Sequence, residues 1–171
     1  MNIDPHWGTN ADFKTFVDCA HSQGMKVVLD IVMNHTGDVI RYNGSGKAAI
    51  PAGRENAKNP AWLNKLTNYH NRGDVQDWND KFWAQNGDFF GLDDIKTENA
   101  EVVNGFADIY AKWINEYGVD AFRVDTAKHV DDAFLGKWWP KVVVATKATK
   151  PTAYAFGEVF DASQDVLSAF V

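Results

Sequence analysis

The stretch VDAFRV, from Val119 to Val124, has the composition of a buried strand in a parallel sheet. Two similar runs are KVVLDIVM, from Lys26 to Met33, and AYAFGEV, from Ala153 to Val159. Nearly continuous aliphatic and β-branched residues are typical of strands that are covered on both faces. The three runs therefore predict the strands of one sheet.

Helical patterns separate these runs, with apolar residues repeating at three- and four-residue intervals. The predicted helices are Asn10–Gln23, Glu101–Tyr117 and Asp131–Lys147. We expect Asn10 to cap the first helix, Gly24 and Gly118 to end the first two, and Pro140 to kink or split the third. Strands that alternate with helices indicate βα units, and so an α/β fold with a parallel sheet.

Residues 36–100 separate the first strand from the second helix. A βα loop usually has about 2–6 residues, so this segment is an insertion. It lacks long periodic stretches, and we interpret it as a small irregular subdomain. Its scattered aromatic residues fit half-buried packing as well as they fit a functional surface.

Length and composition exclude several classes of protein. The chain has 171 residues, and a complete (β/α)₈ barrel needs at least about 200. The net charge of −6 argues against nucleic acid as a partner. No apolar run approaches the roughly 18 residues of a membrane span. The single cysteine, Cys19, excludes an intrachain disulfide and a multi-cysteine metal site.

Polar residues gather where each predicted strand ends. They are Asp30, Asn34 and His35 toward the end of the first strand, Arg123, Asp125, Lys128 and His129 around the end of the second, and Glu158 at the end of the third. The carboxyl ends of parallel strands meet at one edge, which carries the active site in α/β barrels. We therefore expect these side chains to share a site.

Asp125 and Glu158 have the chemistry of a catalytic carboxylate pair. Cleavage of a glycoside with retention needs two carboxyl groups about 5–5.5 Å apart, and neighbouring strands lie about 4.8 Å apart. Arg123, two residues earlier on the same face, can hold Asp125 ionised. An apolar surrounding is expected to raise the pKa of Glu158. The alternative is an Arg123–Asp125 ion pair that only fixes the interior.

Four segments resemble signature motifs of the α-amylase family of glycoside hydrolases. They are LDIVMNH, GVDAFRVDTAKH, FGEV and the shorter GLDDIKTEN, from Gly91 to Asn99. The resemblance covers essentially the whole chain, in the family's order and spacing. It implies a partial (β/α)₈ TIM barrel containing about strands 3 to 5. The implied divisions are barrel residues 1–35, an inserted subdomain at 36–100, and barrel residues 101–171.

The resemblance also implies roles for single residues. Asp125 matches the nucleophile, Glu158 the general acid/base, and Arg123 the arginine that orients the nucleophile. The substrate-binding positions that match are His35, Lys128, His129 and the supporting Asp30.

A calcium ion is the implied metal, joining the subdomain to the barrel. Its matching ligands are the amide of Asn34, the carboxylate of Asp94 and the backbone carbonyl of His129, all hard oxygen donors that suit calcium. Without the resemblance, a turn-forming Asn34 and a loop-capping Asp94 are equally good interpretations.

Some family features have no match in these residues, namely the third catalytic carboxylate and the first two barrel strands. We therefore expect the chain to be part of a longer amylase-type protein, and to be inactive when isolated. Asp93 also stands where the short motif often has proline.

The leading hypothesis is an endo-acting α-amylase on α-1,4-glucans such as starch or maltodextrin, favoured by the pair Lys128-His129. A cyclodextrin-forming transglycosylase is the first alternative, and a non-catalytic glucan-binding fragment is the second. The sequence leaves the compartment and the oligomeric state open.

Overall fold

A computed structural model describes residues 2–170 of the chain. Its central element is a three-stranded parallel sheet of β1 (Val28–Val32), β6 (Ala121–Asp125) and β7 (Tyr154–Gly157), in that order. The register places Asp30 beside Arg123, and Arg123 beside Phe156. The predicted strands and their order are confirmed, although each observed strand is shorter than the apolar run that predicted it.

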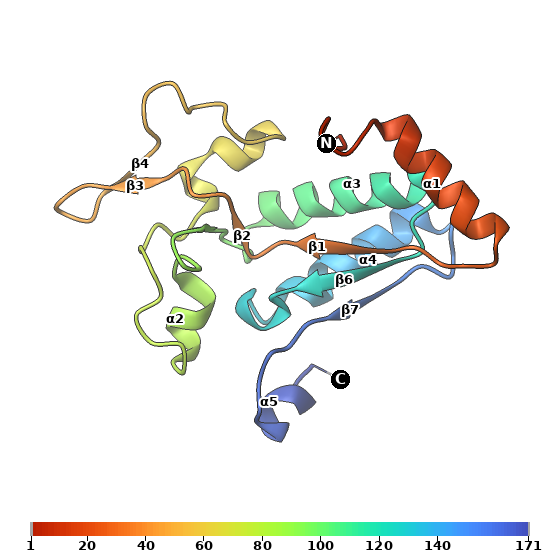
Figure 1. Ribbon diagram of the computed structural model, residues 1–171. Helices are drawn as coiled ribbons and strands as arrows, with labels where there is room; N and C mark the ends of the chain where they lie inside the picture. The colour runs from red at the N-terminus through yellow and green to blue at the C-terminus, as the bar shows by residue number, and fades with distance from the viewer. Residues whose placement is uncertain (1, 171) are drawn as a thin grey trace.

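Two long helices, α3 (Ala100–Tyr117) and α4 (Phe134–Thr146), cover one face of the sheet (Figure 1). Their apolar sides enclose Phe122 and Val124 of β6, which are almost fully buried. Gly118 ends α3 with a left-handed φ of 82°, as predicted from its place after the last periodic residue.

The first helix, α1 (Asn10–Ser22), begins differently from the prediction. Its N-cap is Thr9, and Asn10 is the first helical residue. Thr9 and Asp12 form a reciprocal capping box, in which each side chain accepts a hydrogen bond from the other's backbone N–H. Asn10 instead accepts a hydrogen bond from the backbone N–H of Ile3.

Pro140 does not split the third predicted helix. Helix α4 starts at Phe134, three residues later than expected, and continues through Pro140 to Thr146. Proline removes one backbone hydrogen bond inside a helix. Trp138 and Val142, on either side of Pro140, are fully buried, and their packing offsets that loss.

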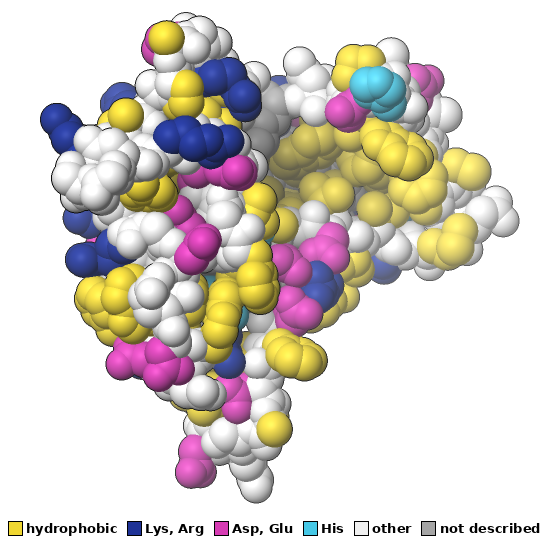
Figure 2. Space-filling model, turned by 60° about the vertical axis from the view of Figure 1, so that its left-hand side comes forward, with side chains coloured by type: hydrophobic (Ala, Val, Ile, Leu, Met, Phe, Trp, Pro, Cys, Tyr) yellow, Lys and Arg dark blue, Asp and Glu magenta, His cyan; other side chains and the backbone are white. Residues whose placement is uncertain are grey.

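The expectation that the strands are covered on both faces is wrong for β1 and β7. Val28 and Val32 of β1, and Tyr154 and Phe156 of β7, are between 39% and 51% exposed. These residues alternate toward the sheet face that α3 and α4 do not cover. In the space-filling view, a hollowed hydrophobic surface lies beside a cluster of acidic and basic side chains (Figure 2).

The inserted segment lies beyond the carboxyl ends of β1 and β6 (Figure 1). Its elements are short: β2 (His35–Thr36), β3 (Arg41–Tyr42), β4 (Ala48–Ala49), η1 (Ala61–Asn64), η2 (Leu66–Asn68), α2 (Lys81–Asn86) and β5 (Asp93–Asp94). It packs on α3 through Trp62 of η1. A Cβ added to Gly105 of α3 would lie 2.3 Å from the Trp62 ring, so this contact requires glycine.

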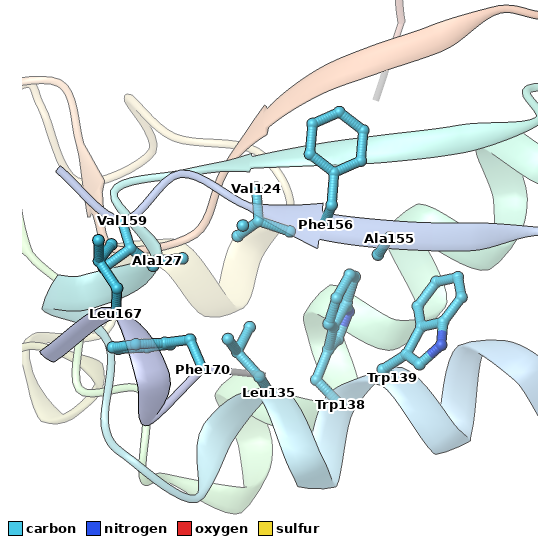
Figure 3. Close-up of a pocket in the computed structure, with 11 residues that line it drawn as sticks. Val124, Ala127, Leu135, Trp138, Trp139, Ala155, Phe156, Val159, Leu167 and Phe170 are labelled. Carbon is cyan, nitrogen blue, oxygen red and sulfur yellow. The ribbon is translucent and has the colours of Figure 1, made fainter. Parts of the chain in front are cut away.

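An apolar cavity of about 590 Å³ lies between β7, α4 and the short α5 (Gln164–Ser168) (Figure 3). Trp138 and Trp139 of α4 face it from one side, and Leu167 and Phe170 close one end. The side chain of Phe156 points away from the two tryptophans. The cavity is therefore on the helix side of the sheet, opposite the face that carries Arg123. Within residues 2–170, no helix combines the length and the apolar character needed to cross a bilayer.

Candidate functional site

Arg123 of β6 is the centre of the site, because its guanidinium contacts three carboxylates. Nη1 donates to both oxygens of Asp30, at 2.9 and 2.8 Å, and to Asp125 at 3.2 Å. Nη2 lies 2.9 Å from Oε1 of Glu158. These acids raise the pKa of Arg123, chiefly through the hydrogen bonds to Asp30. Residues in or directly after three neighbouring strands thus supply one charged cluster with an excess of acids.

Asp125 and Glu158 lie on the same face of the sheet, at the ends of neighbouring strands. Alternation along β6 puts Asp125 on the side of Arg123, and the same guanidinium bonds to both carboxylates. About a quarter of the Asp125 side chain and a third of the Glu158 side chain are exposed. Both acids therefore contact one guanidinium from neighbouring strands, and their role as a catalytic pair stays a prediction.

The prediction of a raised pKa for Glu158 is wrong for the described chain. The backbone N–H of Thr126 donates to Oε2 at 3.3 Å, and this bond, with the Arg123 charge, lowers the pKa of Glu158. An apolar surrounding was expected from Phe156 and Gly157. The Phe156 ring is instead half exposed, and the favourable contacts outweigh the desolvation of the carboxyl group.

The backbone around Glu158 is fixed by β6 and by η3 (Ala127–His129). Its N–H donates to the carbonyl of Val124 at 2.8 Å, and its carbonyl accepts from the N–H of Ala127 at 3.0 Å. Gly157 allows this approach, because a Cβ there would lie 2.7 Å from the Cβ of Ala127. The acid at the end of β7 is therefore held by the segment that follows Asp125.

His35 and His129 both pack against the Phe89 ring. The ring is stacked on His35 at 5.2 Å and meets His129 edge-on at 5.1 Å. Nδ1 of His129 contacts the carbonyl of Ala84 in α2 at 2.8 Å, so this side chain is buried against the subdomain. Burial lowers the pKa of both histidines, and for His35 it outweighs the charge of Asp125.

Lys128 is held by the segment after β7. Its Nζ donates to Oδ2 of Asp161 at 2.9 Å and to the carbonyl of Phe160 at 3.2 Å. About a quarter of its side chain is exposed, and its partner Asp161 follows Glu158 by three residues. The contact orders the loop beside the acid.

Asn34 and Asp94 present oxygens suited to a cation. Both residues are 1% exposed, and Oδ1 of each is buried with no hydrogen-bond partner among residues 2–170. β2 pairs with β5, which places His35 beside Asp94, and the N–H of Ile95 donates to the Asn34 carbonyl at 2.8 Å. Unsatisfied buried oxygens are costly unless something binds them.

The second oxygen of Asp94 accepts a hydrogen bond from Nδ1 of His70. Burial raises the pKa of Asp94 to about 7, although this hydrogen bond opposes the shift. For His70, burial works against the charged form, but Asp94 and Glu98 outweigh it and raise the pKa. Residues 2–170 contain no cluster of three His, Cys, Asp or Glu side chains able to hold a metal. The Asn34 amide and the Asp94 carboxylate both offer oxygen atoms. Calcium binds such oxygens together with backbone carbonyl oxygens, so these two residues fit part of a calcium site.

The chain matches the family model described as the catalytic domain of α-amylase over residues 1–171. An α-amylase of Streptomyces lividans is 35% identical over 99% of this chain, and a cyclomaltodextrin glucanotransferase of Klebsiella oxytoca is 34% identical over 95%. The chain belongs to the α-amylase family of glycoside hydrolases.

Solved structures of α-amylases contain the fold described for this chain. An α-amylase of Geobacillus thermoleovorans, solved with acarbose, superposes with a TM-score of 0.75 at 32% identity, covering 99% of this chain. The chain spans 34% of that structure, 23% of the Streptomyces enzyme and 25% of the Klebsiella enzyme. The described fold is thus part of an α-amylase (β/α)₈ barrel, with an irregular segment inserted after its first described strand.

Several residues that pack around the candidate site were given no individual role by the sequence. They are His70, Phe89, Trp78, Phe90 and Asp161. Glu98 belongs to the GLDDIKTEN motif but was given no role. His70 lies between loop residues with no periodic pattern, and only the folded subdomain brings it to Asp94. Phe89 and Phe90 are among the aromatics of the insertion for which the sequence left packing and a functional surface equally open.

Proposed function

We propose that the protein carrying this chain cleaves α-1,4-glucosidic bonds of starch-type glucans with retention of configuration. The supporting observation is the Asp125–Arg123–Glu158 arrangement at the ends of neighbouring strands. Two relatives named as α-amylases, 35% and 30% identical over nearly the whole chain, support the same substrate class.

In the proposed mechanism, Asp125 attacks the anomeric carbon while Glu158 donates a proton to the departing glycosidic oxygen. A covalent glycosyl–Asp125 intermediate forms, and the chain released is the leaving group. Glu158 then takes a proton from the incoming acceptor hydroxyl, which attacks the same carbon and frees Asp125. Arg123 keeps Asp125 oriented, and the surplus of carboxylates favours the positive charge of the transition state.

Glu158 must be protonated to start this sequence, yet its pKa is lowered in the described chain. A bound glucan excludes water from the carboxyl group, and desolvation raises the pKa of a carboxyl. Substrate binding is therefore proposed to prepare the acid. His35, Lys128 and His129 are the proposed sugar contacts around the pair, and Asp30 supports them through Arg123.

Calcium is proposed at the joint between the sheet and the subdomain, held by Asn34 Oδ1, Asp94 Oδ1 and the His129 carbonyl. The two buried oxygens without partners support it. A bound calcium ion would fix the subdomain against the sheet, which keeps His35 and His129 beside Phe89. We also propose the divisions 1–35, 36–100 and 101–171, because residues 36–100 form the irregular insertion.

Assays on soluble starch test the function, using the longest gene product that contains this chain. Asp125→Asn and Glu158→Gln should each reduce the release of reducing ends by about 10³-fold or more. Asp165→Asn, at an exposed acid of α5, is the matched control and should leave the rate unchanged. Full activity in either site variant would refute the proposal.

A glucosyl fluoride separates the two roles, because fluoride leaves without a proton. The Glu158→Gln enzyme should still form the glycosyl intermediate from this substrate, and the Asp125→Asn enzyme should not. Products decide between water and sugar as the acceptor: hydrolysis yields linear malto-oligosaccharides, and transglycosylation yields cyclic or lengthened ones. The glucanotransferase of Klebsiella oxytoca among the relatives is the reason to include this measurement.

A further inference from the structure

His70 lies in the subdomain between two carboxylates. Its side chain is 5% exposed, Nδ1 donates to Oδ2 of Asp94, and Nε2 lies 3.1 and 3.2 Å from the two oxygens of Glu98. A carboxylate only accepts hydrogen bonds, so both ring nitrogens act as donors. His70 therefore has no lone pair free for a metal.

Neighbouring residues hold the backbone of Asp94 and one of its two carboxylate oxygens. Its backbone is in β5, paired with β2, and its N–H donates to Oδ1 of Asp88 at 3.1 Å. His70 holds Oδ2 of the side chain. Oδ1 alone has no partner within residues 2–170, and it shares this property with Oδ1 of Asn34. The rotation that decides where Oδ1 points is thus set by the bond from His70.

We propose that His70 is a positioning residue that presents Asp94 to the metal as a one-oxygen ligand, with Glu98 holding the imidazole in place. This inference rests on the calcium site proposed above. Without His70, the Asp94 carboxylate can turn or bind the ion through both oxygens, which changes the geometry of the site. Groups that orient a metal ligand typically change metal affinity by about 10–100-fold when removed.

Calcium affinity, measured by isothermal titration on the longest gene product that contains this chain, tests the inference. His70→Gln keeps the size and polarity of the side chain but cannot bridge two carboxylates, and it should weaken calcium binding by about 10–100-fold. Glu98→Gln should weaken it less, because the bond to Asp94 survives. His6→Gln is the matched control, since His6 contacts Asp4 in the same way on an exposed surface, and it should bind calcium like the wild type.

Thermal unfolding with and without calcium separates positioning from general support. A purely structural role lowers the melting temperature equally in both conditions. A positioning role makes the calcium-dependent rise in melting temperature smaller in the variant, because a ligand that binds more weakly stabilises the folded state less.

The experiment distinguishes a failure of the proposed calcium site from a failure of the proposed role of His70. A wild-type chain that binds no calcium overturns the metal site and this inference with it. A wild-type chain that binds calcium, with His70→Gln binding equally well, overturns only the role of His70. Should His70→Gln fail to fold, Glu98→Gln decides, because Glu98 is partly exposed and its loss leaves the core intact. Unchanged affinity in that variant overturns the inference.

Discussion

Gly157 passes so close to Ala127 that a methyl group at position 157 would lie 2.7 Å from the Ala127 Cβ. This approach brings the end of β7 against η3, where Glu158 and Ala127 share a backbone hydrogen bond of 3.0 Å. Gly157→Ala should push the two segments apart. Overpacking of this kind costs about 1–3 kcal/mol, and the displaced Glu158 should lower glucan cleavage by at least about tenfold.

Denaturant unfolding and starch assays measure both effects. Gly136→Ala is the control, because nothing lies within 4 Å of its Cβ position in the helix α4. Alanine is the better helix former, so this variant should gain about 0.5–1 kcal/mol of stability. Equal behaviour of the two variants would mean that the Gly157 contact is unimportant.

Asp120 predicts a pH dependence of stability. Its buried carboxylate accepts hydrogen bonds from Lys150, the Val27 N–H and His21. Burial acts to raise the pKa of Asp120, but these bonds outweigh it and hold the pKa well below its usual range. A carboxyl with a lowered folded-state pKa stabilises the fold above its unfolded pKa, about 3.9, and loses that contribution as the pH falls below it.

Urea unfolding between pH 7 and pH 3 measures this contribution. The wild type should lose stability below about pH 4, and Asp120→Asn should be about 2 kcal/mol less stable at pH 7, with a flatter pH dependence. Asp18→Asn, at an exposed pair with Lys14 on α1, should follow the wild-type curve. If the stability of Asp120→Asn fell with pH as steeply as that of the wild type, Asp120 would not be the source of the pH dependence.

The strands, and the meeting of their polar side chains around Arg123, could be predicted because both depend on local pattern and on topology. Asp30, Asp125 and Glu158 end or interrupt apolar runs, and parallel strands bring such positions to one edge. The lowered pKa of Glu158 could not be predicted, because it depends on a hydrogen bond from the Thr126 backbone N–H and on the second nitrogen of Arg123. The helix start at Thr9 could have been found, since Thr9 and Asp12 have the spacing of a capping box.

The contact of His70 with Asp94 could not be predicted from the sequence. The insertion has no period from which side-chain directions follow, and contacts such as His70–Asp94 arise when loops distant in sequence fold together. Lys58 and Asp93 form another buried pair of this kind. The departure of Asp93 from the usual proline therefore has a structural reason, since its carboxylate also accepts from the N–H groups of Val39 and Ile40.

Phe90 is expected to bind sugar and not to support the fold. Its ring is 76% exposed, stacks on Trp78 at 4.8 Å, and belongs to the aromatic cluster that reaches His35 through Phe89. Its φ of 53° is unfavourable for a residue with a Cβ. Phe90→Gly removes the ring and relaxes this backbone, so the unfolding free energy should change by less than about 1 kcal/mol.

The same variant should raise the KM for maltodextrins several-fold, because an exposed aromatic face that stacks on a sugar ring is lost. Phe16→Ala is the control, since Phe16 is also exposed but lies on α1, away from the carboxylates. A KM unchanged by Phe90→Gly would remove Phe90 from the glucan surface.

The 171-residue chain alone should hydrolyse starch slowly or not at all. Within residues 2–170, β1 and β7 each pair with β6 and with no other strand, so both leave an edge open. The face that carries Arg123 also exposes Val28, Val32 and Phe156, which favours association between copies. Light scattering should show species larger than 19.1 kDa. Starch hydrolysis by the purified chain, abolished by Asp125→Asn, would contradict this prediction and would mean that the associated chains assemble a working site.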